Sequence, residues 1–455
     1  MKRQYLSIII SLIMLTLISC EGGSEGKKNS SAAPTELAFW AKTYGGTGQD
    51  YAYSIQQTSD GGYIVAGMGD TFDFDKDLWV LKLNSDGTVA WQKAYRGDDI
   101  SASFIQQTSD GGYIVLGVIF NDATRKKYFL VLKLNSDGTV AWQQKAYGET
   151  GYEYANSIQQ TSDGGYIMAG IGIDFDRIDS DFLVLKLNSD GRIAWQKTYG
   201  GTGGDHANSI QQTSDGGYIV VGGSNVANED VLVLKLNSDG TVVWQKTYGG
   251  TKSDSASSIQ QTSDEGYIVV GNTYSFGTGS GDFWILKLNS YGTVAWQKTY
   301  GGTSYDYASS IQQTSDEGYI VVGNTYSFGT GSGDFWILKL NSDGTVAWQK
   351  TYGGTSYDFA NSIHQTSDGG YIVAGYTYSF GAGFCDFWVL KLLSDGTINF
   401  NSNSGASTTD TSATVSETSV TGADINITVT DTSITTTDIM LRVVDIYTTI
   451  NQQAP

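Results

Sequence analysis

The chain is poor in three residue types on which many secreted and catalytic proteins depend. Its 455 residues include 2 cysteines, 2 histidines and 2 prolines. So few cysteines exclude a disulfide framework, and neither His206 nor His364 stands in a recognisable nucleophile or metal motif. No proline occurs between Pro34 and Pro455, which suits strands that use every backbone N–H.

Positive charge is also scarce. The chain has 27 lysines and arginines against 47 aspartates and glutamates, a net charge of −20 at pH 7. This balance argues against binding nucleic acid or anionic lipid through bulk electrostatics. Carboxylates abound, but they recur in every repeat, which indicates turns and caps before catalysis. We therefore expect no enzyme activity, no cofactor and no metal site.

What the sequence contains in abundance is one repeated strand. The pattern T-V-A-W-Q-K-T-Y-G-G recurs at about 50-residue spacing, with a degenerate last copy at Phe400. The repeated tryptophans are Trp40, Trp91, Trp142, Trp195, Trp244, Trp296 and Trp348. A period of this length that holds several short strands is typical of propeller blades.

A single repeat predicts four antiparallel strands. In the copy that ends at Tyr95 they cover residues 51–58, 62–67, 78–83 and 88–95, and Asp-Gly turns join the first to the second and the third to the fourth. A blade with two apolar faces must stack on neighbours, and we expect the tryptophan to form that contact. Seven S-I-Q-Q-type strands and one surplus tryptophan strand predict a seven-bladed β-propeller whose ends share a blade. An open β-solenoid is the alternative.

The N-terminus carries an export signal. Lys2 and Arg3 precede an apolar run that is too short for a membrane span, so residues 1–19 form a predicted signal peptide. Leu17 to Cys20 resembles a bacterial lipobox, which implies lipid on Cys20, and residues 20–35 form a flexible tether. An ordinary signal peptide with an incidental cysteine is the alternative. The expected location is the bacterial outer membrane or the cell surface.

Composition divides the rest into the propeller, residues 36–403, and a tail, residues 404–455. The tail is rich in threonine, serine and aspartate, and its acidic residues recur every seven positions, at Asp410, Glu417, Asp424, Asp431 and Asp438. Alternating threonine and valine favour extended or short β structure. A stalk, an interaction tail and a small added sheet are all compatible with this pattern.

Two stretches resemble known families. Leu83 to Trp91, L-N-S-D-G-T-V-A-W, resembles the tryptophan-docking repeat of quinoprotein-type propellers. The hairpin from Ser54 to Gly67 is similar to repeats of tandem-repeat surface lipoproteins of bacteria and archaea. Quinoprotein dehydrogenases hold their cofactor with an adjacent cysteine pair and a calcium site. This chain lacks such a pair, so the resemblance implies architecture and no catalytic residue.

Function is expected where the copies differ. The loop between the second and third strands is aromatic in three consecutive copies, which suggests a ligand-binding rim. Its residues are Tyr274, Phe276, Tyr326, Phe328, Tyr378 and Phe380. Alternatively, these phenylalanines fold under as loop anchors. Earlier copies carry acidic insertions, such as residues 73–77, that partly resemble a calcium loop but lack its glycine and distant glutamate.

A second variable loop enters the first strand of each repeat. The copies at 244–295 and 296–347 differ at only four positions, and three of them lie in this loop. The four differences are Lys252 against Ser304, Ser253 against Tyr305, Ser255 against Tyr307, and Tyr291 against Asp343. Tyr51, Tyr154, His206, Tyr307 and Phe359 are equivalent in this loop. They indicate either packing between blades or an aromatic binding rim.

These observations predict a monomeric, non-catalytic binding module that is attached to a membrane through a lipid anchor. Its expected ligand is a glycan or a protein, bound by the propeller loops. A periplasmic scaffold for envelope assembly is the first alternative, and a quinoprotein-like enzyme is the second.

Overall fold

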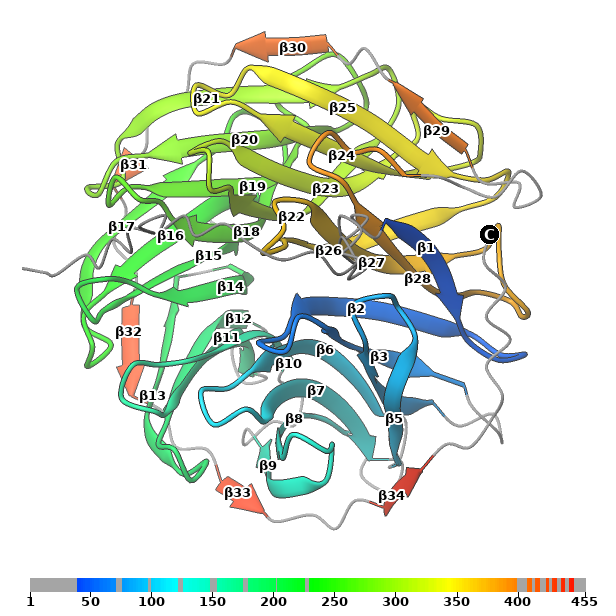
Figure 1. Cartoon of the computed structure of the whole chain (residues 1–455). Helices are drawn as coiled ribbons and strands as arrows, with labels where there is room; N and C mark the ends of the chain where they lie inside the picture. Colours follow the sequence, from blue (N-terminus) through cyan, green and yellow to red (C-terminus); the bar gives the residue numbers. More distant parts are fainter. Residues whose placement is uncertain are drawn as a thin grey trace, which may run out of the picture. The chain divides into compact units, whose positions relative to one another are not determined.

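A computed structural model describes residues 39–70, 76–96, 100–121, 126–147, 154–174, 179–201, 203–225 and 229–398, and six short strands beyond them. All regular secondary structure in these segments is β, and none of it is a helix able to cross a membrane. The predicted fold class is confirmed, because the strands form seven four-stranded blades of a β-propeller (Figure 1).

Each blade is an antiparallel meander. Blade 1 contains β2 (Asp50–Gln57), β3 (Tyr63–Gly69), β4 (Asp77–Leu83) and β5 (Val89–Arg96). Blade 2 contains β6 (Ile100–Gln107), β7 (Tyr113–Asn121), β8 (Lys126–Leu134) and β9 (Val140–Tyr147). Blade 3 contains β10 (Tyr154–Gln160), β11 (Tyr166–Asp174), β12 (Asp179–Leu187) and β13 (Ile193–Gly200). Blade 4 contains β14 (Asp205–Gln212), β15 (Tyr218–Ser224), β16 (Asp230–Leu236) and β17 (Val242–Tyr248).

The remaining blades follow the same order. Blade 5 contains β18 (Asp254–Gln261), β19 (Tyr267–Thr273), β20 (Asp282–Leu288) and β21 (Val294–Gly301). Blade 6 contains β22 (Asp306–Gln313), β23 (Tyr319–Thr325), β24 (Asp334–Leu340) and β25 (Val346–Gly353). Blade 7 contains β26 (Asp358–Gln365), β27 (Tyr371–Thr377), β28 (Asp386–Leu392) and, from the other end of the chain, β1 (Trp40–Tyr44).

The ring closes through this shared blade. β1 pairs antiparallel with β28, with Trp40 opposite Lys391 and Tyr44 opposite Phe387. The surplus strand that the sequence predicts is therefore the outer strand of blade 7. The degenerate copy at Phe400 lies outside the described residues.

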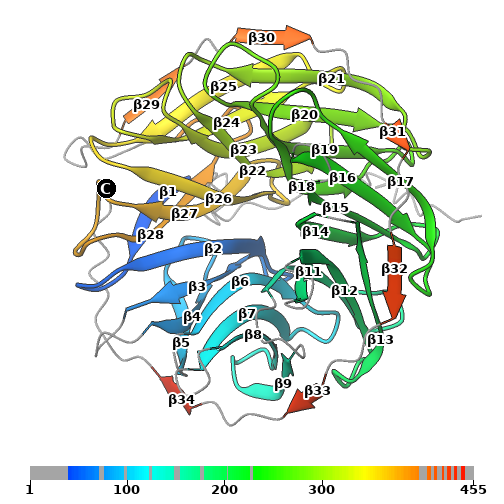
Figure 2. The same cartoon turned by 180° about the vertical axis from the view of Figure 1, so that it is seen from behind.

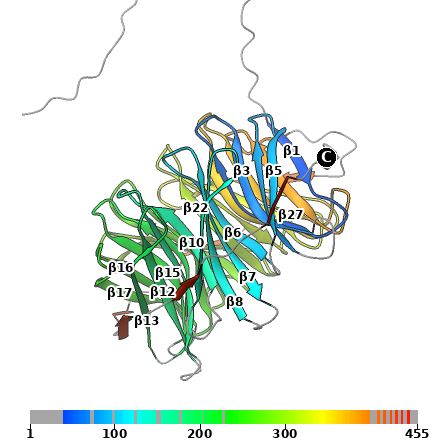
Figure 3. The same ribbon diagram turned by 90° about the horizontal axis from the view of Figure 1, so that it is seen from below.

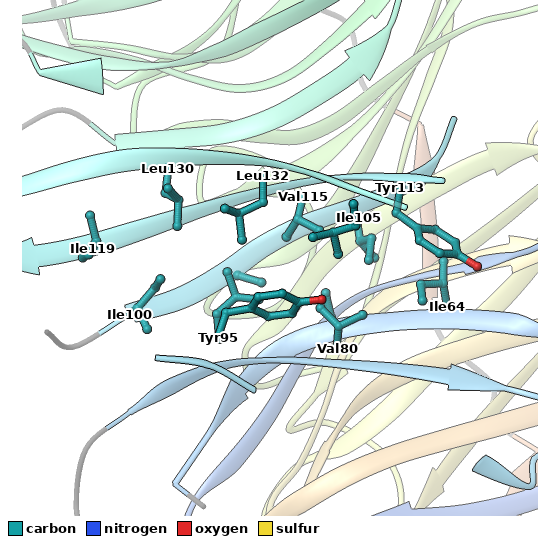
Figure 4. Packing of buried hydrophobic residues seen from close by; sticks show 14 of the residues in the cluster. Ile64, Val80, Tyr95, Ile100, Ile105, Tyr113, Val115, Ile119, Leu130 and Leu132 are labelled. Atoms are coloured by element: carbon teal, nitrogen blue, oxygen red, sulfur yellow. The ribbon is translucent and has the colours of Figure 1, made fainter. Parts of the chain in front are cut away.

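Apolar packing between blades holds the ring together. Seven clusters of buried residues occupy the seven interfaces between neighbouring blades, the closing interface included. At the interface of blades 1 and 2, Val80 and Tyr95 meet Val115 and Leu130 (Figure 4). Burying this apolar surface favours folding by roughly 25 cal/mol per Å².

The repeated tryptophan is a blade-to-blade contact, as predicted. Trp91 of blade 1 meets Tyr113 of blade 2 edge to face, with ring centroids 6.0 Å apart. The same pair recurs at every interface, and at the closing one Trp40 meets Tyr63 at 5.9 Å. Four residues after Trp91, Tyr95 donates its hydroxyl proton to the carbonyl oxygen of Gly138 in the next blade. Closure therefore repeats the chemistry of an ordinary interface.

The paired glutamines of the inner strands also join blades. The backbone N–H of Gln107 donates to Gln56 Oε1 of the preceding blade at 2.7 Å. Within the described residues this bond recurs at six of the seven interfaces. At the remaining interface, between blades 7 and 1, His364 stands where the other blades have the accepting glutamine.

The two faces of the ring differ in what they carry. Because the strands alternate in direction, the loop into the first strand and the loop from the second to the third strand share one face, called here the loop face. The tight turns share the other, called the turn face. On the turn face of blade 1, Asp60 accepts hydrogen bonds from the Thr58 hydroxyl, the Gly62 backbone N–H and Lys82 Nζ. All seven blades carry this lysine–aspartate pair.

Six strands of the tail add a fifth strand to six blades. They are β29 (Ser407–Asp410), β30 (Thr414–Glu417), β31 (Ala423–Asp424), β32 (Thr428–Asp431), β33 (Thr435–Thr437) and β34 (Arg442–Asp445). They pair with blades 6, 5, 4, 3, 2 and 1 in that order, so the tail runs backward along the outside of the ring (Figures 1 and 2). The short strands predicted for the tail thus extend the propeller sheets.

Candidate functional site

Exposed aromatic residues gather on the loop face. Among the described residues, six large hydrophobic side chains are exposed, and four of these belong to loops of this face. They are Tyr305 at 44%, Tyr326 at 36%, Tyr357 at 44% and Phe384 at 71%. The other two, Val243 and Tyr291, lie beside a tight turn of the opposite face. Figure 3 shows the ring from its edge, so that its two faces point in opposite directions.

Nine rings of the loop face form one unbroken series of contacts, called here the aromatic arc. Its centroid separations run from 4.7 to 6.4 Å. In order the rings are Tyr274, Tyr305, Tyr307, Tyr326, Tyr357, Phe359 and Tyr376, and Tyr376 contacts both Tyr378 and Tyr51. The arc therefore spans blades 5, 6, 7 and 1.

Four kinds of position supply these rings, one of them the second strand itself, in which Tyr376 of β27 lies. Tyr305 and Tyr357 lie in the loop into the first strand, and Tyr307 stands two residues further on, in that strand. Tyr326 follows the end of the second strand of blade 6. Parallel stacking within one loop, 5.9 Å between Tyr305 and Tyr307, alternates with an edge contact of 6.4 Å from Tyr307 to Tyr326.

Tyrosine hydroxyl groups contact each other at two points in the arc. Tyr274 donates to the hydroxyl oxygen of Tyr307 at 3.3 Å, and the hydroxyl oxygens of Tyr51 and Tyr378 are 3.1 Å apart. Burial raises the pKa of Tyr51 and of Tyr307 above the ordinary value, and their tyrosine neighbours raise it further. The arc therefore presents neutral hydroxyls between apolar ring faces.

The sequence-predicted site residues divide into two groups. Tyr274, Tyr326 and Tyr378 belong to the arc. Phe276, Phe328 and Phe380 are half-buried against fully buried tryptophans, Trp284, Trp336 and Trp388, at 5.2 to 5.4 Å between centroids. The structure thus gives these phenylalanines the anchoring position that the sequence left as an alternative. Whether any of the six binds a ligand stays a prediction.

Sequence reasoning did not select Tyr305, Tyr357 or Tyr376 as site residues. A signal for Tyr305 exists, because it is one of the four differences between two otherwise identical copies. Tyr376 also differs from its equivalents, Asn272 and Asn324, and each of these asparagines accepts a hydrogen bond from a backbone N–H of the next blade.

Pairs of buried carboxylates lie between the blades on the same face. At the interface of blades 6 and 7, Asp334 Oδ1 and Asp358 Oδ2 both lie within 3.0 Å of the point that a Cβ on Gly353 would occupy. Asp334 Oδ1 has no hydrogen-bond partner among the described residues. Burial, and the charge of Asp358, raise the pKa of Asp334 to about 6. The equivalent burial at the closing interface raises the pKa of Asp386 to about 6 and of Asp50 to about 7.

Pairs of ionisable side chains also lie on the loop face, in blades 1 and 4. His206 Nε2 lies 3.6 Å from Glu229 Oε1, and Arg96 Nε lies 3.2 Å from Asp77 Oδ2. The possible calcium loop cannot be assessed, since residues 71–75 lie outside the described part. Within that part, no three histidine, cysteine or acidic side chains converge as metal ligands would.

Apart from Tyr291, the described part of the turn face offers repeated features. A groove of about 450 Å³ between blades 4 and 5 is lined by Asp215, Lys235, Trp244 and Tyr291. A second groove with equivalent lining follows one blade later. Because these residues form the lysine–aspartate pair and the tryptophan contact of the scaffold, the grooves follow from the way that blades stack.

Comparison with known proteins identifies no relative by sequence. No protein-family model matches the chain, and neither does any curated protein. Among solved structures, Sqt1 from Chaetomium thermophilum is 12% identical, with 81% of this chain and 87% of that chain covered at a TM-score of 0.44. A protein of unknown function from Dyadobacter fermentans is 11% identical, with 77% and 97% covered at a TM-score of 0.43. Neither similarity assigns a function to this chain.

Proposed function

We propose that this protein is a non-catalytic binding module whose aromatic arc binds a glycan chain. The observation that carries the proposal is the unbroken series of rings across four blades, in which Tyr305, Tyr326 and Tyr357 are exposed. A sugar ring has apolar C–H faces and hydroxyl edges. Tyrosine rings offer a matching apolar face, and their hydroxyls offer hydrogen bonds.

The extent of the arc favours a polymer over a compact ligand. Rings recur at one loop after another, so successive units of a chain would meet similar surfaces. The arc carries no charged side chain of its own, and tyrosine hydroxyls are neutral at physiological pH because their ordinary pKa is about 10. Burial raises the pKa of Tyr51 and Tyr307 further. An uncharged glycan therefore fits the arc better than a nucleic acid does, in a chain whose net charge is −20.

Two variants on opposite faces test this function. Tyr305→Ser with Tyr307→Ser reproduces the serines that blade 5 carries at the same positions, Ser253 and Ser255. We expect this pair to weaken binding about tenfold or more, because two stacking rings are removed. Tyr291→Asp, which reproduces Asp343 on the turn face, is the matched control and should leave binding unchanged.

The probes are cello-, xylo-, malto- and chito-oligosaccharides, first on an array and then by titration calorimetry. Binding by at least one probe, lost in the serine pair and kept in the control, supports the proposal. Binding that survives the serine pair removes the arc from the site. If no oligosaccharide binds, the glycan proposal fails, and capture of a protein through the same tyrosines becomes the reading to test.

We further propose that lipid on Cys20 attaches the module to a membrane. The support is the sequence from Leu17 to Cys20, because residues 1–38 lie outside the described part of the chain. In cells fed an alkyne fatty acid, the wild-type protein should become labelled, whereas the Cys20→Ser variant should not. Equal labelling of both would remove the anchor.

A further inference from the structure

The tail contains as many acidic repeats as there are blades that carry a tail strand. The seven-residue spacing continues to Asp445, which gives six acidic positions. Six blades pair with a tail strand, and among the described residues blade 7, whose outer strand is β1, has none. A strand of about four residues and a link of about three would take the tail from one blade to the next, since an extended residue advances about 3.3 Å.

The acidic positions are in register with one lysine per blade. Five times, the acidic residue of a tail strand stands directly opposite the lysine that follows the repeated tryptophan by two residues. These pairs are Asp410 with Lys350, Glu417 with Lys298, Asp424 with Lys246, Asp431 with Lys197, and Asp445 with Lys93. An acidic residue thus stands opposite a lysine in five of the six tail pairings.

Blade 2 departs from this register for a reason that is visible in its sequence. An extra glutamine, Gln144, precedes its lysine, so that Lys145 follows Trp142 by three residues. Lys145 accordingly stands opposite Thr437, the residue before Asp438. The insertion moves the lysine by one position and leaves the spacing of the tail intact.

Packing against the next blade holds these lysines at the outer edge. The point that a Cβ on Gly138 would occupy lies 2.8 Å from Lys93 Cδ and 2.9 Å from the ring of Trp91. The same lysine stem lies along the turn glycine at Gly240, Gly292 and Gly344. In these four blades the ring itself therefore holds the lysine stem in place.

From this register we infer that the outer edges of blades 1 to 6 are a recognition surface for an acidic extended peptide with a carboxylate every seventh residue. Its occupant is the tail of this chain, residues 407–445. Backbone pairing supplies the attachment, as in other cases of strand addition. The lysines supply the register, because opposite charges at directly opposed positions favour one alignment and a one-residue slip loses it. This inference does not depend on the proposed glycan site.

A charge exchange at blade 5 tests the inference in the full-length protein. The variants are Glu417→Lys, Lys298→Glu and the two together, and the measurement is amide hydrogen exchange of residues 414–417 by mass spectrometry. Each single variant should speed exchange about three- to tenfold, and the double variant should restore most of the protection. Salt at about 1 M should shrink these differences.

The design separates recognition from damage to the ring. Lys298 also contributes, after hydrogen bonds from Thr345, to the lowered pKa of Asp343 in the next turn. Glu417→Lys leaves that contact in place and is the cleaner single variant. Lys42→Glu, in β1 of blade 7, is the control and should leave exchange of the tail unchanged. If the double variant exchanges as fast as the singles, charge register does not position the tail.

Discussion

Burial raises the pKa of carboxylates on both faces, but hydrogen bonds outweigh that effect on only one of them. On the turn face, Asp60 keeps a pKa of about 2, because hydrogen bonds from Thr58 and Lys82 outweigh the effect of its partial burial. On the loop face, burial raises the pKa of Asp334 to about 6, and backbone hydrogen bonds offset this only in part. The repeated aspartate of the turn face therefore has a lysine partner in each blade, whereas the loop face holds like charges close together.

This difference matches where the sequence repeats and where it varies. The turn-face aspartate and its lysine occur in all seven blades, which fits a role in holding the ring. The loop face carries most of the residues that differ between blades. Beneath them, buried carboxylates such as Asp334 and Asp358 repel each other. The repeated scaffold contacts and the proposed binding site thus occupy opposite ends of the same strands.

The largest expected effect comes from removing a like charge on the loop face. Asp334→Asn should stabilise the protein by about 1 to 3 kcal/mol at pH 8, since the amide is neutral and can donate to Asp358. The pKa of Asp334 in the folded state lies above its unfolded value near 4, so the protonated side chain favours folding. The wild type loses this contribution to its stability as the pH rises from about 4 to 6. Thermal unfolding of both proteins at pH 4 and pH 8 measures the effect.

At pH 4 the two proteins should unfold at similar temperatures, because Asp334 then holds a proton. Asp50, Asp230 and Asp386 should leave a residual pH dependence in the variant, as burial raises their pKa values to between about 6 and 7. A variant that is less stable than the wild type at pH 8 would contradict the reading of the loop face.

The matched change on the turn face should have the opposite sign and a smaller size. Asp316→Asn removes the charge that faces Lys339, whose side chain is buried, and should destabilise the protein by about 1 kcal/mol at pH 7. Hydrogen bonds from Thr314 and Lys339 lower the pKa of Asp316 despite the opposing effect of burial, so this loss should vanish in strong acid. Urea unfolding at pH 7 and at a series of lower pH values provides the test.

Most of the fold could be predicted because its determinants are local. Asp-Gly turns mark most of the tight hairpins, and in the copy that ends at Tyr95 the predicted and observed strands agree to within two residues. Glu265 and Glu317 replace the glycine of this pair in two turns, and Tyr291 replaces the aspartate in a third. Closure followed from counting strands. The course of the tail could not be predicted, because six nearly equivalent edges compete for each short strand and the choice depends on contacts across the ring.

The candidate site was less accessible to sequence reasoning. Phe328 and Tyr326 are both aromatic residues of one loop, yet Phe328 turns toward Trp336 and Tyr326 toward Tyr357. Burial behind a specific partner decides between them, and composition does not contain that information. The sequence did contain one signal for the buried phenylalanines. Blades 5, 6 and 7, whose loops carry Phe276, Phe328 and Phe380, also carry the tryptophans at 284, 336 and 388.

The pairing of β1 with β28 also fixes the order in which the ring can be completed during synthesis. Trp40 is made first, but its partner Lys391 follows about 350 residues later, a separation that slows folding through loop-closure entropy. Meanwhile β24, D-F-W-I-L-K-L, presents almost the sequence of β28, D-F-W-V-L-K-L. The fourth strand of each new blade must therefore pair quickly with the third strand of that blade. Otherwise β1 could pair there and close a smaller ring.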